Sequence, residues 1–253
     1  MAKIIYQPKG KAKEYSPWAA NFYNGCSNKC DYCYNRHCQA KGLLGKDEPT
    51  LKKGLDMFNV IDTFKKELTK YREQILADGK GLFFNFVSDP MLEETRVVNI
   101  TCILYTIQAG VPAVVLTKCA DWYEEFVDMF RADENKNIPL AKQMIKFGFT
   151  LTGFDDMEHG ASTNNDRITL MKKLNYEGYK TWASIEPIID CNRSLMMMCK
   201  SAPFCDEYKI GVLSGKKNYT PEQVKELIRK VNRLRDIYGF DLTLKDSVFN
   251  FIK

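Results

Sequence analysis

Three cysteines lie close together in the sequence, at Cys26, Cys30 and Cys33. Three thiolates can bind a metal centre and leave one coordination position open, and an open position is where a metal centre does chemistry. Iron–sulfur clusters are held by cysteine thiolates, usually four, so a set of three fits a 4Fe-4S cluster whose last iron takes a ligand that is not a cysteine. The spacing therefore predicts a 4Fe-4S cluster on this loop.

Two other uses of these cysteines compete with a cluster. A disulfide framework is disfavoured, because the chain has nine cysteines, an odd number, and is longer than small disulfide-stapled domains. A zinc site normally takes two close pairs of ligands, and here the fourth ligand would be a scattered residue such as His37 or Cys38. A zinc-stabilised, nucleic-acid-binding module is therefore the alternative.

Length and composition narrow the class of protein. The 253 residues match the roughly 250 of an α/β barrel, so we expect one domain over 1–253. No apolar run approaches the ~20 residues of a membrane span, so we expect no membrane association. The first residues form no charged-then-apolar leader, which favours a cytoplasmic location with reduced thiols. The net charge of +5 permits a nucleic-acid partner without requiring one.

Strand and helix patterns alternate along the chain. Short apolar runs predict strands at 18–23, 81–87, 111–116, 147–151, 181–185, 208–213 and 242–244. Apolar residues at helical spacing predict helices at 56–79, 94–108, 120–131, 140–146, around 168–174 and 220–239. This alternation predicts an α/β fold with parallel strands, a partial (β/α)6-type TIM barrel. The thiol loop follows the first strand, at the end where such folds place active sites.

The spacing of the three cysteines, with an aromatic residue just before the last, resembles the cluster motif of the radical S-adenosylmethionine superfamily. The resemblance implies that the amino and carboxylate groups of S-adenosylmethionine chelate the open iron. It also implies a partial barrel, a flavodoxin or ferredoxin reductant, and reductive cleavage of the cofactor to a 5′-deoxyadenosyl radical that abstracts hydrogen from a substrate. The zinc module would have no radical chemistry.

Further motifs resemble the spore photoproduct lyase branch of that superfamily. They are Asn21 to Cys26, Cys33-Tyr34, Ser88-Asp89-Pro90, Leu116-Thr117-Lys118, Arg167, and Ser184 to Pro187. In that branch the serine of the Ser-Asp pair and the lysine after the third strand contact the cofactor, which implies these roles for Ser88 and Lys118. The lyase has a hydrogen-donating cysteine two residues before that serine, whereas this chain has Phe86. Thymine-dimer repair by that route is disfavoured, and a nucleic-acid or nucleotide substrate is a weaker implication.

The polar tips of the predicted strands supply the candidate cofactor contacts. These are Ser88, Asp89, Lys118, Thr152, Arg167, Ser184 and Glu186. Lys118 and Arg167 suit the carboxylate of the cofactor, and hydroxyl or carboxylate groups suit its ribose. Each has a structural alternative: Ser88 or Asp89 could cap the next helix, Lys118 could be solvated, and Arg167 could pair with Asp166 or Glu177.

Two residues are candidates for catalytic contact with the substrate. Cys119 follows Lys118 on the predicted rim, and Tyr34 follows the last thiol of the loop. Cys191, Cys199 and Cys205 could in principle hold a second cluster, but small core residues or free thiols are the simpler interpretation of their spacing.

Overall fold

An open, mostly parallel sheet lies at the centre of the computed structural model, which describes residues 3–132 and 142–253. Its eight strands run in the order β1-β2-β5-β6-β7-β8-β9-β10. The strands are β1 Ile5–Tyr6, β2 Ala19–Ala20, β5 Leu82–Phe84, β6 Ala113–Thr117, β7 Ile145–Thr150, β8 Lys180–Ile188, β9 Glu207–Val212 and β10 Asp241–Leu244. Only β1 is antiparallel to its neighbour. Within the described residues β1 and β10 do not pair with each other, so the predicted partial barrel is confirmed.

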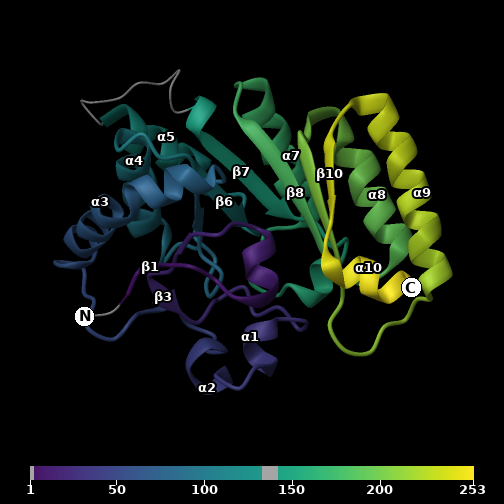
Figure 1. Ribbon diagram of the computed structural model, residues 1–253, viewed down its shortest axis with the longest axis horizontal. Coiled ribbons are helices and arrows are strands. Elements are labelled where there is room, and N and C mark those ends of the chain that lie inside the picture. Colours follow the sequence, from purple (N-terminus) through teal and green to yellow (C-terminus); the bar gives the residue numbers. More distant parts are fainter. Residues whose placement is uncertain (1–2, 133–141) are drawn as a thin grey trace.

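Helices cover the outer face of this sheet (Figure 1). They are α3 Val60–Asp78, α4 Arg96–Gln108, α5 Tyr123–Ala132, α7 Asn164–Tyr176, α8 Cys191–Ser201 and α9 Pro221–Tyr238. The last helix, α10 Asp246–Ile252, follows β10 and lies at the end of the sheet. Two short helices, α1 Tyr34–His37 and α2 Lys41–Leu44, follow the thiol loop. The chain also forms 3₁₀ turns at Gly10–Glu14, Asp155–Met157 and Ala202–Phe204. No helix among the described residues is long and apolar enough to cross a membrane.

The two faces of the sheet have different partners. In β6 alternate residues point to opposite faces, as they must in a strand, so Ala113 and Val115 pack in the main core beneath the helices. Val114 and Leu116 face the other way and pack against a smaller apolar cluster formed by Ala19, Phe83 and Trp182. This smaller cluster marks the inner, concave face of the partial barrel.

The connection from β1 to β2 crosses this inner face. Its 3₁₀ turn reaches the far edge of the sheet, where Lys245 Nζ donates to Lys11 O at 3.3 Å. Tyr15 follows the turn, and its ring lies 5.7 Å from the ring of Phe83 and 5.9 Å from that of Trp182. The chain's own amino-terminal segment therefore fills part of the barrel interior.

Most of the predicted elements are present, and two need correction. The predicted strand 18–23 is split, because Ala19–Ala20 join the main sheet while β3, Tyr23–Asn24, pairs with β4, Thr50–Leu51, in a separate two-stranded sheet. The thiol loop therefore follows β3. The predicted helix 140–146 begins in 133–141, outside the described residues, and its last two residues, Ile145 and Lys146, belong to β7.

Local end signals account for the best-predicted helix. Thr220 and Gln223 form the predicted capping box before α9, and Gly239 ends the helix with a φ of +75°. Helices α8 and α10 were not predicted. Helix α8 packs on β8 and α10 packs on β9, and this packing stabilises two short helices whose sequences alone do not predict them.

Candidate functional site

The thiol loop, residues 25–33, is held against the polar segment that follows it. Cys26 N donates to Lys46 O at 3.0 Å. Gly25 has a φ of +86°, and a Cβ there would lie 2.2 Å from Glu48 O. A side chain at position 25 would push the two segments apart, so glycine is required for the close approach.

A second segment, residues 155–162 after β7, lies on the other side of the loop. Asp31 N donates to Met157 O and Gly160 N donates to Asn28 O, both at 3.0 Å, and Cys30 forms an antiparallel bridge with Glu158. A Cβ at Gly160 would lie 2.0 Å from Ser27 O. The thiol loop is therefore clamped between two segments that are distant from each other in sequence.

The three thiols differ in exposure. Cys30 is 6% exposed, whereas Cys26 and Cys33 are half-buried. Burial raises the pKa of Cys26 to about 12, and burial also raises the pKa of Cys30, against the opposing effect of the Lys118 ammonium. Metal binding to these thiols would therefore release protons.

No three Cys, His, Asp or Glu side chains within residues 3–132 and 142–253 converge on a position for a single metal ion. A 4Fe-4S cluster makes a different demand, because each thiolate binds a separate iron, whereas zinc ligands all lie within ~2.3 Å of one ion. A cluster site instead needs a fixed loop of separated thiols, with cofactor-binding groups beside it. The loop meets the first requirement through the contacts described above.

Ser88 is a candidate for the second requirement. Its Oγ is buried and has no hydrogen-bond partner within the described part of the chain. Both neighbours are tied to the thiol region, because Asn35 Nδ2 donates to Val87 O at 3.0 Å and Asn28 Nδ2 donates to Asp89 Oδ2 at 2.9 Å. A buried hydroxyl without a partner is costly, so its position beside the loop fits a ligand that supplies one.

Lys118 lies at the carboxyl end of β6, close to Cys30. Burial lowers the pKa of Lys118, but the nearby Cys30, Glu158 and Asp89 more than offset this, and the net pKa is raised. Its Nζ lies 5.7 Å from the centre of the Tyr32 ring and makes no ion pair with any residue that the structure describes. A charged ammonium without a carboxylate partner fits the predicted role of binding the cofactor carboxylate.

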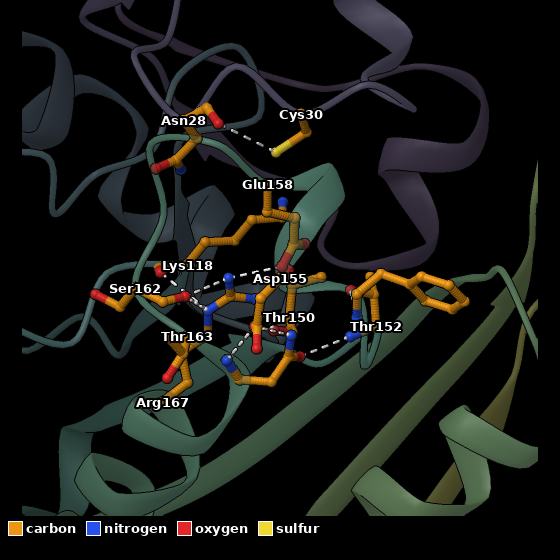
Figure 2. Close-up of polar contacts among 12 residues, drawn as sticks. Asn28, Cys30, Lys118, Thr150, Thr152, Asp155, Glu158, Ser162, Thr163 and Arg167 are labelled. Atoms are coloured by element: carbon orange, nitrogen blue, oxygen red, sulfur yellow. Dashed lines mark hydrogen bonds and ion pairs between the residues drawn. The ribbon is translucent and has the colours of Figure 1, made fainter.

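Arg167 is placed differently from the prediction. It is fully buried, and Nη2 donates to Glu158 Oε2 at 2.7 Å, while the other nitrogens donate to backbone oxygens of Lys118, Thr150 and Ser162. Glu158 in turn accepts a hydrogen bond from the Tyr32 hydroxyl. Figure 2 shows Arg167 and Glu158 beneath Cys30, with Lys118 beside them. The ion-pair partner of Arg167 is thus the buried Glu158, and neither Asp166 nor Glu177.

The remaining predicted contacts are partnered within the chain. Thr152 Oγ1 accepts from Phe154 N at 3.2 Å, so Thr152 organises the loop after β7. Ser184 Oγ lies 2.8 Å from the Tyr15 hydroxyl, which also donates to Glu186. Glu186 Oε2 accepts from Lys245 Nζ at 2.7 Å. Ser184 and Glu186 therefore hold the amino-terminal segment on the inner face.

The two candidate catalytic residues have opposite surroundings. Cys119 is 5% exposed and packs in the main core, and its Sγ lies 3.8 Å from Asn28 Oδ1, so it faces the back of the thiol loop. Tyr34 is 58% exposed, and its hydroxyl donates to Phe86 O. The structure thus leaves Tyr34, and not Cys119, accessible at the mouth.

The carboxyl-terminal cysteines do not form a group. Cys191 and Cys199 lie near opposite ends of α8, and Cys199 is exposed. Cys205 is buried beyond that helix, and its Sγ donates to Glu207 O at 3.2 Å. The simpler interpretation, core residues and free thiols, describes their positions.

Solved structures provide a comparison for the whole chain. One similar structure is spore photoproduct lyase complexed with dinucleoside spore photoproduct. The similarity covers 94% of this chain and 78% of the lyase chain, with a TM-score of 0.64 and 14% sequence identity. The chain shares the fold of that lyase. SuiB of Streptococcus suis bound to S-adenosylmethionine matches over 87% of this chain and 44% of its own, with a TM-score of 0.58 and 11% identity. SuiB bound to the precursor peptide SuiA gives a TM-score of 0.59 at 11% identity, over 93% of this chain and 51% of its own.

These likenesses confirm the predicted fold, which the chain shares with spore photoproduct lyase and with SuiB. The chain spans less than half of SuiB in the complex with S-adenosylmethionine. No family model matches the chain, and no curated protein matches it in sequence.

Sequence reasoning missed three residues of the site: Asn28, Tyr32 and Glu158. Asn28 and Tyr32 lie between the cysteines, where their side chains were not assigned a role. Glu158 lies in a loop without strand or helix periodicity, and only its contacts with Arg167, Tyr32 and Cys30 identify it. The sequence signal for Glu158 was Arg167, a single arginine in a predicted helix next to a polar loop, and this signal does not say which residue the arginine binds.

Proposed function

We propose that the protein is a radical S-adenosylmethionine enzyme that binds a 4Fe-4S cluster through Cys26, Cys30 and Cys33. One observation carries the proposal: a clamped loop of three thiols at the mouth of a partial barrel, with the unpaired ammonium of Lys118 beside Cys30. A cation and an open-sided cluster are the two features that a cofactor with amino, carboxylate and sulfonium groups requires.

The residues of the site divide the work of binding this cofactor. Lys118 Nζ would donate to the cofactor carboxylate, and Ser88 Oγ would bond to a ribose hydroxyl. Cys26, Cys30 and Cys33 would hold the 4Fe-4S cluster, which when reduced would supply the one electron needed to cleave the sulfonium bond of S-adenosylmethionine to methionine and a 5′-deoxyadenosyl radical. The apolar inner face, with Phe83 and Trp182 fully buried, would keep water away from the reacting atoms.

A nucleic acid or a nucleotide is the substrate class that we propose. One support is the similarity to spore photoproduct lyase, which covers a larger share of the lyase chain than the similarity to SuiB covers of the SuiB chain. The other is the net charge of +5, which favours an anionic substrate. The rings of Phe83 and Phe86 stack 4.1 Å apart at the inner face, so position 86 offers an aromatic surface for stacking a base and no thiol to donate hydrogen. The reaction would therefore differ from that of the lyase.

The reductant that we propose is a flavodoxin or ferredoxin of the same cytoplasm. The test of the enzyme itself does not need it, because dithionite can replace the protein donor. Purified protein is reconstituted anaerobically with iron and sulfide, incubated with S-adenosylmethionine and dithionite, and assayed for 5′-deoxyadenosine. Single-stranded oligonucleotide, mononucleotide and no substrate form three parallel arms.

We expect about four irons per chain, a brown colour and 5′-deoxyadenosine from the wild-type protein. Cys30→Ala should abolish both the cluster and the product, whereas Cys199→Ala, an exposed cysteine outside the loop, should retain both. An increase in the oligonucleotide or mononucleotide arm identifies the substrate class. A colourless protein with one zinc would instead establish the structural zinc module.

A further inference from the structure

Both backbone groups of Lys118 are bound by buried charged side chains. Lys118 N donates to Asp89 Oδ2 at 2.7 Å, and Lys118 O accepts from Arg167 Nε at 3.0 Å. Asp89 is 7% exposed and Arg167 is fully buried. The main chain of Lys118 is thus fixed from both sides.

Both charged side chains are engaged by partners within the chain. The two carboxylate oxygens of Asp89 accept four hydrogen bonds: Oδ2 from Lys118 N and Asn28 Nδ2, and Oδ1 from Thr117 Oγ1 at 2.6 Å and Met91 N at 3.0 Å. Four is about the number of acceptor sites that a carboxylate has. The three nitrogens of Arg167 likewise all donate to oxygens of the chain.

Each of the two also reaches the thiol loop. Asp89 does so directly, through the side chain of Asn28, which is 2% exposed. Arg167 does so through Glu158, which accepts from the Tyr32 hydroxyl and pairs in backbone with Cys30. One connection starts at the backbone nitrogen of Lys118 and the other at its carbonyl oxygen, and both end on residues 28–32.

We propose that Asp89 and the Arg167–Glu158 pair are positioning residues, which form a two-sided clamp that fixes Lys118 relative to the thiol loop. They act through Lys118 and the loop and do not touch the cofactor. This assignment rests on the proposed function for its purpose, because a cation and a cluster that bind the same small molecule must be held at a constant separation. It replaces the direct cofactor contacts that the sequence predicted for Asp89 and Arg167.

The first experiment uses the metal-free, full-length chain. Tyr32→Phe removes the hydroxyl that donates to Glu158 and keeps the aromatic ring beside Lys118. Amide hydrogen exchange of the peptide containing residues 27–33 is measured by mass spectrometry. Loss of a hydrogen bond to a charged group should raise exchange in this peptide at least about tenfold. Exchange in α9, far from the site, should stay at the wild-type rate.

The matched control is Lys118→Met, which removes a proposed cofactor contact and none of the clamp contacts, since these involve the Lys118 backbone. Its exchange in 27–33 should equal the wild-type value, while its affinity for S-adenosylmethionine falls. Arg167→Lys is a second variant: a lysine would rescue a direct charge contact but cannot donate to Lys118 O, Thr150 O and Glu158 together.

The outcomes separate the two proposals. Unchanged exchange in Tyr32→Phe, or an increase that spreads equally to α9, overturns the clamp. Wild-type affinity for S-adenosylmethionine in Arg167→Lys overturns it as well. If the wild-type protein binds no S-adenosylmethionine after reconstitution, the proposed function fails, and the exchange data for the metal-free chain still decide whether the clamp holds the loop.

Discussion

Arg167 Nη2 lies 2.7 Å from Glu158 Oε2, and both side chains are completely buried. A buried pair is costly to break, because removal of one partner leaves an uncompensated charge in the interior. This pair joins the segment after β7 to the amino-terminal turn of α7, directly behind the thiol loop. Stability and site geometry therefore depend on the same contact.

Glu158→Ala should lower the free energy of unfolding by about 3–5 kcal/mol. For a chain of this size that corresponds to a fall in Tm of roughly 10 °C, measured by thermal denaturation of the metal-free protein. The control is Arg229→Ala, which removes an exposed pair with Glu226 and should change stability by less than about 1 kcal/mol. Equal effects of the two substitutions would contradict the structure.

Ser88→Ala should separate binding from stability. The Ser88 hydroxyl is buried without a partner in the described chain, so its removal should leave the free energy of unfolding unchanged or raise it by up to about 1 kcal/mol. The same substitution should lower the affinity for S-adenosylmethionine about tenfold, measured by equilibrium dialysis of the reconstituted protein, and should leave its iron content unchanged. Wild-type affinity would remove Ser88 from the cofactor site.

Gly160→Ala should displace the thiol loop by contact alone. The new methyl group would lie 2.0 Å from Ser27 O, which is backbone and cannot rotate away. We expect a loss of about 1–3 kcal/mol in stability and a lower iron content after reconstitution. Gly42→Ala is the matched control, since no atom lies within 4 Å of its Cβ. Full iron loading of Gly160→Ala would show that the loop tolerates this displacement.

Cysteine alkylation should report the burial of the other thiols. Thiolates are the reactive form, and burial raises the pKa of Cys205 to about 12, so roughly one molecule in 10⁴ carries that thiolate at pH 8. Iodoacetamide at pH 8 should therefore modify the exposed Cys199 first and leave Cys205 and the buried Cys102 unmodified. Raising the pH toward 12 should increase the rate at Cys205. Early modification of Cys205, read by peptide mass spectrometry, would contradict its placement.

The helix and strand pattern was largely predictable because it is local. The capping box at Thr220 and the terminal Gly239 fix the ends of α9 within a few residues of chain. The split of the first strand was not predictable, because Ala19–Ala20 and Tyr23–Asn24 carry one continuous apolar pattern. Their assignment to two sheets depends on the partners β5 and β4, which come much later in the chain.

The candidate site divides in the same way. The spacing of Cys26, Cys30 and Cys33 by itself determined that three thiols share one loop, and the strand pattern determined that Ser88 and Lys118 lie at carboxyl ends of strands. Only the tertiary structure decided that Asp89 and Arg167 bind partners within the chain, that Ser184 and Glu186 hold Tyr15, and that Glu158 belongs to the site. The reason is physical: hydrogen-bonding capacity is a property of residue type and can be seen in a sequence, but the partner that uses it is brought near only by packing. Asn28 and Asp89 are 61 residues apart in the chain, and Tyr15 and Ser184 are 169 apart.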